Sequence, residues 1–104
     1  MATVHRLAPR GGVDGVRRAL LAELEAWTAR SEWEAPGPTW TASVERLVAI
    51  VPTSWEDGGD PERSVYACAS AFQRGARLAA DDVGIRMLLL EGLVGSLLLL
   101  GGGR

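Results

Sequence analysis

The sequence predicts an all-α protein, a compact four-helix bundle with an apolar C-terminal helix packed centrally. Three observations favour this fold: apolar residues recur at steps of three and four, proline-containing breaks separate these stretches, and the segment Val83–Leu100 is almost entirely apolar. The 104 residues, 47% hydrophobic and 23% charged, suit one folded domain. We therefore expect a single helical domain over 1–104, with a flexible lead-in at 1–12 and a flexible tail at 101–104.

The first helix is expected from Val13 to about Ser31. Its apolar residues fall on one helical face at steps of three and four: Val13, Val16, Leu20, Leu24 and Trp27. Asp14 lies in the first turn and has Arg18 four residues later, the spacing of an ion pair on a helix surface. These features predict an amphipathic helix with one buried side.

A corner is expected over Ser31–Thr39, because the Pro-Gly-Pro run at 36–38 removes two amide donors and restricts φ. A second helix then spans about Thr41–Val51, with Thr39 or Thr41 as its N-cap and Pro52 as its stop. The short run of β-branched residues over 44–51 leaves a strand as the alternative.

The third helix is expected to begin at Pro61, with Asp60 as N-cap and Glu62 in the first turn. One apolar seam runs along it: Val65, Ala69, Phe72, Ala76 and Ala79. The last helix begins after Asp81 and Asp82, which supply a cap, and continues through Leu100 until the terminal glycines end it.

The segment Val83–Leu100 has only three plainly polar side chains, Arg86, Glu91 and Ser96. Each step of five residues rotates the side chain by about 140° around a helix, so these three form no solvated stripe. The segment is therefore expected to be buried at the bundle's centre, against another protein, or in a bilayer. Glu91 near its middle disfavours the bilayer, and the centre of the bundle is the favoured placement.

The charge and composition of the chain limit the classes of partner that we expect. The formal net charge is -2, and the basic residues, all arginine, are spread along the chain, so no nucleic-acid partner is favoured. A helix-turn-helix regulator that reads DNA with Arg63, Arg74, Arg77 and Arg86 remains a weaker alternative. The absence of Lys and Asn suggests a GC-rich, most simply bacterial, genome. No apolar run directly follows Met1–Arg10, so we expect no secretory signal and a cytoplasmic location.

No residue pattern indicates catalysis or a cofactor. His5 is the only histidine, and Cys68, the only cysteine, is expected to be a buried structural thiol. The acidic residues Glu56, Asp57, Asp60 and Glu62 lack the alternating ligands of an EF-hand and suggest a solvated turn with a helix cap. We expect no enzyme, no metal site and no cofactor.

Two regions are candidates for binding. Trp27, Trp33, Trp40 and Trp55 surround the first corner and the second loop, and they predict either an aromatic cluster closing the bundle or a groove. The other candidate is the leucine-rich end: Leu97, Leu98, Leu99 and Leu100. We therefore expect a non-enzymatic interaction module, an adaptor or homo-oligomerising subunit, that docks a protein partner or its own copy through Trp33, Trp40 and Trp55 or through these leucines. A small membrane-associated protein that inserts its last helix is the second hypothesis.

Overall fold

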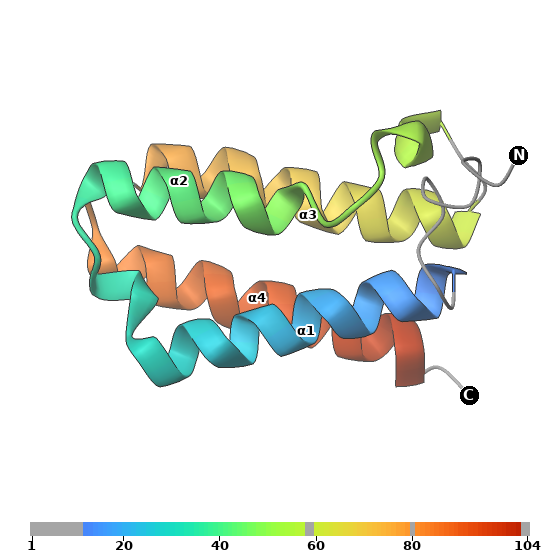
Figure 1. Ribbon diagram of the computed structural model, residues 1–104, viewed down its shortest axis with the longest axis horizontal. Helices are drawn as coiled ribbons and strands as arrows, with labels where there is room; N and C mark the ends of the chain where they lie inside the picture. The colour runs from blue at the N-terminus through green and yellow to red at the C-terminus, as the bar shows by residue number, and fades with distance from the viewer. Residues whose placement is uncertain (1–11, 58–59, 80, 103–104) are drawn as a thin grey trace, which may run out of the picture.

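The computed structural model describes residues 12–57, 60–79 and 81–102, and this part of the chain is helical without strands (Figure 1). Four α-helices alternate in direction, which confirms the predicted all-α four-helix bundle. In chain order the elements are α1 (Gly12–Arg30), the short 3-10 helix η2 (Glu32–Glu34), α2 (Gly37–Val48), the 3-10 helix η3 (Thr53–Asp57), α3 (Asp60–Leu78) and α4 (Val83–Gly102).

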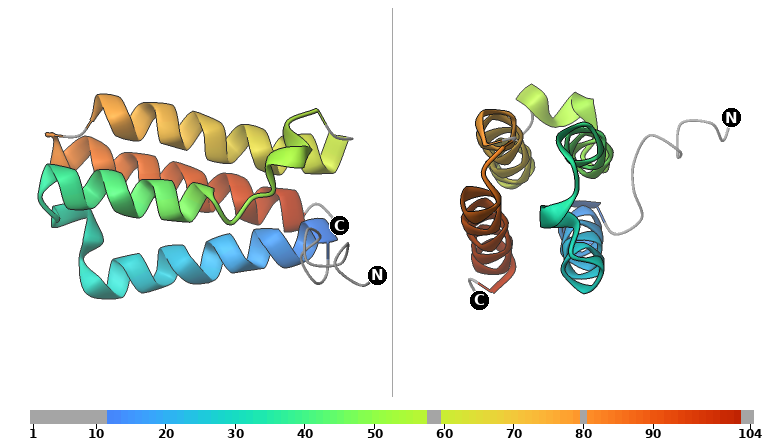
Figure 2. Two further views of the ribbon diagram at one scale, coloured as in Figure 1. Left: turned by 45° about the horizontal axis from the view of Figure 1, so that its top comes forward. Right: turned by 90° about the vertical axis from the view of Figure 1, so that its left-hand side faces the viewer.

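Viewed along the bundle, the four helices stand at the corners of a square, with α3 beside both α2 and α4, and α1 beside α4 (Figure 2). The helix α4 packs against α3 and α1, as the predicted bundle requires, and it occupies one corner of the square. Only 22% of the apolar window Val83–Gly101 is buried within the chain. A helix at one corner of a four-helix bundle encloses only the side that faces the shared core.

The core follows the predicted apolar seams. On α1, Val16, Leu20, Leu24 and Trp27 are buried and Val13 is half-buried. The whole seam expected for the third helix is buried, with its last member directly after the end of α3: Val65, Ala69, Phe72, Ala76 and Ala79. The helix α4 adds Leu90, Leu93 and Leu97. Periodicity therefore identified the buried faces of α1 and α3 correctly, because each of these helices has a polar side that fixes its orientation.

An aromatic cluster lies at the centre of the core. The ring centroids of Trp27 and Trp40 are 5.7 Å apart, and Phe72 lies 6.4 Å from Trp27 and 6.3 Å from Trp40. The Trp40 Nε1–H donates to the Ala76 backbone oxygen at 3.1 Å, which satisfies the polar atom of a side chain that is 0% exposed. These rings join α1, α2 and α3.

The second helix differs from its prediction at both ends. It begins at Gly37, so Thr39 and Thr41 are not its caps, and it ends at Val48 rather than Val51. Pro38 is tolerated because the first amides of a helix have no intrahelical acceptor, and the Trp40 N–H already bonds to the Pro36 oxygen at 2.8 Å. The alternative strand over 44–51 is wrong, since this run is helix followed by hydrogen-bonded turns.

The last two helices begin close to their predicted starts. The helix α3 begins at Asp60, one residue before Pro61. Asp82 caps α4 as expected, since its Oδ1 accepts a hydrogen bond from the Ile85 N–H at 3.0 Å. The helix continues through Gly102, so 101–102 belong to α4 and not to a tail, while Gly12 belongs to α1 and not to a lead-in. The remaining lead-in and tail, including His5, lie outside the described residues.

Candidate functional site: the outer face of helix α4

The helix α4 presents an apolar surface to solvent. Its large apolar side chains that are between 38% and 78% exposed are Val83, Ile85, Met87, Leu88, Leu98, Leu99 and Leu100. The side opposite the core is formed by Leu88, Gly92, Gly95 and Leu99, with Ile85 and Leu98 beside them, and we call these six residues the outer face of α4. Such a continuous apolar surface is unusual on a protein that works as a monomer, and it is typical of an interaction site.

The two glycines of the outer face are not required by the packing of the chain. A β-carbon built at Gly92 or at Gly95 meets no atom within 4 Å other than those of the neighbouring residues and the adjoining helix backbone. Two other helical glycines differ: a β-carbon at Gly75 would lie 2.8 Å from Leu89 Cδ2, and one at Gly101 would overlap the Arg17 guanidinium. Since glycine inside a helix costs about 1 kcal/mol relative to alanine, Gly92 and Gly95 weaken the isolated chain without a compensating contact.

An apolar groove flanks α4 on each side. The groove toward α1 and η2 has a volume of about 390 Å³ and is lined by Leu24, Thr28, Trp33, Met87, Leu90, Glu91, Val94 and Gly95. The groove toward α3 has a volume of about 420 Å³ and is lined by Ala67, Cys68, Ala71, Phe72, Leu88, Leu89, Gly92, Leu93 and Ser96. The α4 backbone thus forms a ridge between two hollows, a shape that complements the side chains of a helix laid along it.

Arg86 fixes the first half of α4 to the bundle. Its Nη1 donates to the backbone oxygens of Trp33 and Ala35, both at 2.8 Å, and its Nε donates to the Ala79 oxygen at 3.4 Å. The side chain is 3% exposed, and its guanidinium carbon lies 4.7 Å from the Trp40 ring centroid. A planar cation with several donors suits this position because three carbonyl groups and a ring face surround it.

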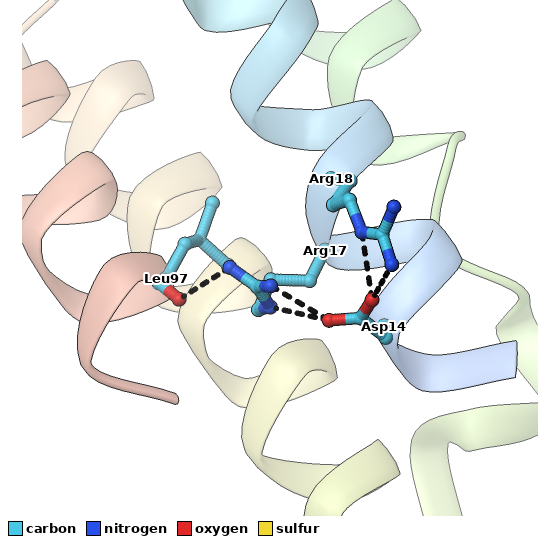
Figure 3. A network of polar contacts seen from close by, with 4 residues as sticks. All are labelled: Asp14, Arg17, Arg18 and Leu97. Carbon is cyan, nitrogen blue, oxygen red and sulfur yellow. Dashed lines mark hydrogen bonds and ion pairs between the residues drawn. The ribbon is translucent and has the colours of Figure 1, made fainter. Parts of the chain in front are cut away.

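Arg17 fixes the other end of α4 (Figure 3). Its Nη2 lies 2.6 Å from Asp14 Oδ1, and its Nη1 donates to the Leu97 backbone oxygen at 3.4 Å. The expected pair of Asp14 and Arg18 is also present, with Arg18 Nε at 2.7 Å from Asp14 Oδ2. Hydrogen bonds from Arg17 and then Arg18 lower the pKa of Asp14 below its ordinary value. The glycine at 101 leaves room for the Arg17 guanidinium over the last turn.

The seven residues expected to bind a partner separate into two groups. Trp40 and Leu97 are each 0% exposed and belong to the core, so neither side chain lies on the surface. Their side chains point inward, because Trp40 packs on Phe72 and Leu97 lies on the buried side of α4. Leu98, Leu99 and Leu100 are exposed, at 55%, 78% and 42%.

The tryptophans do not form one surface. Trp33 is half-buried in η2 and lines the groove toward α1, whereas Trp55 is half-buried in η3 at the opposite end of the bundle (Figures 1 and 2). Trp27 and Trp40 make the core cluster. The expected single aromatic cluster at one end is therefore replaced by a central cluster and two separate half-buried rings.

Sequence reasoning missed Leu88, Gly92, Gly95 and Ile85 as surface residues. A signal was present, because Leu88, Gly92, Gly95 and Leu99 follow one another at intervals of four, three and four, the spacing of one helical face. Because almost all neighbouring residues of the segment are apolar as well, this spacing did not distinguish one side of the helix from another. Which side of α4 faces solvent is decided only by the packing of α1 and α3 against it.

Other candidate chemistry is limited in the part of the chain described. Cys68 is half-buried rather than buried, and burial raises the pKa of its thiol while a hydrogen bond with Ser96 partly lowers it. No group of three or more His, Cys, Asp or Glu among the described residues is arranged to hold a metal ion. Arg86 lies in the core, so the four arginines considered for DNA do not share one exposed face. Arg77 is exposed and pairs with Glu45 at 3.0 Å.

The segment Val83–Gly101 is the one helix in the described ranges that is long and apolar enough, by length and composition alone, to cross a membrane. No protein-family model, curated protein or solved structure matches this chain.

Proposed function

We propose that this protein is a helical protein–protein interaction module whose docking surface is the outer face of α4. The observation that carries the proposal is the exposure of Leu88 and Leu99, at 66% and 78%, on either side of two glycines that the chain itself does not need. An apolar helix of a partner protein fits this ridge with its two flanking grooves. Such helix-in-groove recognition uses side chains at helical spacing on both partners.

The energy available at this face supports binding. Complete burial of one leucine contributes about 1.5–3 kcal/mol relative to exposure, so covering Leu88, Leu98 and Leu99 together supplies a substantial part of a stable association. A partner needs few polar groups at this surface, because Glu91 is the only exposed charged side chain on α4. A partner therefore needs an apolar surface of matching shape more than a set of hydrogen bonds.

The ends of α4 are held in a way that suits a fixed docking surface. Arg86 bonds to carbonyl groups of η2, of Ala35 directly after it and of the α3–α4 turn. Arg17 contacts the last turns of α4 from α1. A surface that is already ordered loses little conformational entropy when a partner binds. The two arginines thus support a preformed interface at the middle of the helix.

The burial and the hydrogen bonds of Arg86 disfavour insertion of α4 into a bilayer. Insertion would break the Arg86 hydrogen bonds to Trp33, Ala35 and Ala79. It would also withdraw the buried leucines of α4 from the core and carry Arg86 and Glu91 into the hydrocarbon. A charged side chain at mid-bilayer costs about 2.5–3.5 kcal/mol on insertion scales. An interfacial helix usually presents several Lys or Arg to the headgroups, whereas the one basic residue of α4 is buried.

Thiol protection in cells tests the proposal. In a Cys68→Ser background, Leu88→Cys places a thiol on the outer face, and Leu78→Cys, where the native side chain is 91% exposed, serves as the matched control. Cells are treated with a permeant maleimide, and labelling is compared in the soluble and membrane fractions. We expect Cys at 88 to be protected in the soluble fraction while Cys at 78 is labelled.

Two results would overturn the proposal. Equal labelling of both thiols would show that the outer face is uncovered in the cell. Protection of position 88 that is confined to the membrane fraction would show that lipid covers α4 instead.

A further inference from the structure

We infer that the partner is a second copy of this chain, whose α4 crosses the first α4 antiparallel about a two-fold axis between Gly92 and Gly95. The inference rests on the proposed function, since it names the occupant of the same outer face. It commits to one geometry, in which the protein is an isologous homodimer.

The residue pattern of the outer face is self-complementary. Along the chain the order is Leu88, Gly92, Gly95, Leu99, which reads the same in both directions with intervals of four, three and four. A two-fold axis perpendicular to two antiparallel helices places residue i opposite residue j and residue j opposite residue i. Leu88 then lies opposite Leu99 of the other copy, and Gly92 lies opposite Gly95. A parallel pair makes no use of this symmetry and aligns the two helix dipoles unfavourably.

The glycines allow the two helices to approach closely at the crossing. At 100° per residue the four residues lie within about 60° of one another, so they form one narrow strip along the helix. Apart from the neighbouring residues and the adjoining backbone of α4 itself, no atom lies within 4 Å of a β-carbon built at Gly92 or Gly95, so this space is open to the other copy. Small residues at a helix crossing let the backbones come together, and the leucines beyond them then interlock.

The area of the face is adequate for a dimer. The 20 residues of α4 extend over about 30 Å, and the ridge with half of each flanking groove is about two helix diameters wide, which gives roughly 600 Å². A standard interface buries about 800 Å² on each partner, near 10% of the surface of a small protein. One tenth of the 6461 Å² exposed by this chain is roughly 650 Å².

The charges of the face are compatible with self-association. Glu91 lies about 70° from the middle of the strip, so its carboxylate reaches the rim, where water remains. In the antiparallel arrangement the two Glu91 residues are offset by about 7 Å along the helix axis, which keeps their repulsion in solvent small. The strip itself carries no charge that would repel its copy.

Cross-linking of mixed single-cysteine variants tests the inference. In the Cys68→Ser background, Leu88→Cys and Leu99→Cys proteins are prepared with one of them isotope-labelled, mixed without detergent, and treated with a short thiol cross-linker. We expect cross-linked 88–99 pairs and no 88–88 or 99–99 pairs, because two copies of position 88 are offset by about 16 Å along an antiparallel pair. Cross-links of 88–88 and 99–99 instead would overturn the antiparallel geometry.

The glycines provide a second readout. We expect Gly92→Ala with Gly95→Ala to raise the dissociation constant at least tenfold while raising the unfolding midpoint of the monomer, because alanine favours the helix but blocks the close approach. Leu78→Glu should leave the dissociation constant unchanged. An unaltered dissociation constant in the double glycine variant would contradict the crossing point.

The two proposals fail differently. A purified chain that remains monomeric and gives no cross-link, although position 88 is protected in soluble cell extract, overturns the second copy as occupant and leaves the proposed function standing. A purified monomer with position 88 labelled in cells overturns both.

Discussion

The Arg86 guanidinium carbon lies 4.7 Å from the centroid of the Trp40 ring, with the two side chains 3% and 0% exposed. This contact joins α4 to α2, and the hydrogen bonds of the two side chains extend it to η2 and α3. A cation among carbonyl oxygens and a ring face keeps its hydrogen bonds without solvent. The pair is thus a polar connection that fixes the first half of α4 to the bundle.

Removal of the Arg86 side chain is expected to destabilise the fold strongly. Arg86→Ala leaves the backbone oxygens of Trp33 and Ala35 without their donor and creates a cavity beside Trp40. We expect a loss of about 3 kcal/mol in the free energy of unfolding. Urea denaturation followed by circular dichroism measures it. Arg86→Lys should recover only part of the loss, because one ammonium group does not reproduce the planar fork. A change under about 1 kcal/mol for Arg86→Ala would contradict this role.

The two tryptophans Trp40 and Trp55 should differ in their tolerance of phenylalanine. Trp40→Phe removes the Nε1–H that bonds to the Ala76 oxygen and narrows the ring under Arg86, so we expect a loss of about 2 kcal/mol in unfolding free energy. Trp55→Phe, at a half-buried position in η3, is expected to cost less than half as much. Similar unfolding midpoints for the two variants would argue against the central position of Trp40.

Asp14 should make stability depend on acid pH. Because its pKa in the folded chain lies below the ordinary value of 3.8, its stabilising effect is present above that value and disappears as pH falls through the folded pKa. Comparison with Asp14→Asn isolates this effect from the other carboxylates. We expect the difference in unfolding free energy between the two proteins to be constant from about pH 5 to 8 and to shrink below about pH 4. A difference that persists unchanged to about pH 2 would contradict the Arg17 and Arg18 pairing.

Cys68 should react slowly as a nucleophile in the folded protein. Burial raises the pKa of its thiol above the ordinary value of 9.0, which lowers the thiolate fraction at neutral pH. We expect iodoacetamide to alkylate Cys68 more slowly in the native chain than in urea, with the native rate still rising above about pH 9. Equal rates in the native and unfolded chains at neutral pH would contradict the shielding of this thiol in its groove.

Amphipathic helices were predictable and the uniformly apolar helix was not. In α1 and α3 polar side chains mark the solvent side, so the apolar seams gave the buried faces directly. In α4 the residues Arg86, Glu91 and Ser96 point in different directions, and the pattern contains no information on which side is enclosed. The start of α2 was placed too late because Pro38 was treated as a breaker, although the first turn of a helix accepts proline.

The candidate site was predictable only in part. Exposure of Leu98, Leu99 and Leu100 follows from their place at the end of the bundle, as expected from the sequence. Burial of Leu97 and of Trp40 depends on contacts between residues distant in the chain. The same holds for Arg86, whose partners Trp33 and Ala35 lie more than fifty residues away. Long-range contacts of this kind leave no periodic trace in a single sequence.

The central claim is that the outer face of α4 joins two copies of the chain, and sedimentation equilibrium without detergent tests it most directly. We predict a mass twice the 11.1 kDa of one chain for the native protein. The Leu88→Glu, Leu99→Glu double variant should remain folded by circular dichroism and show the mass of one chain. A native protein with the mass of one chain at high micromolar concentration would contradict the claim.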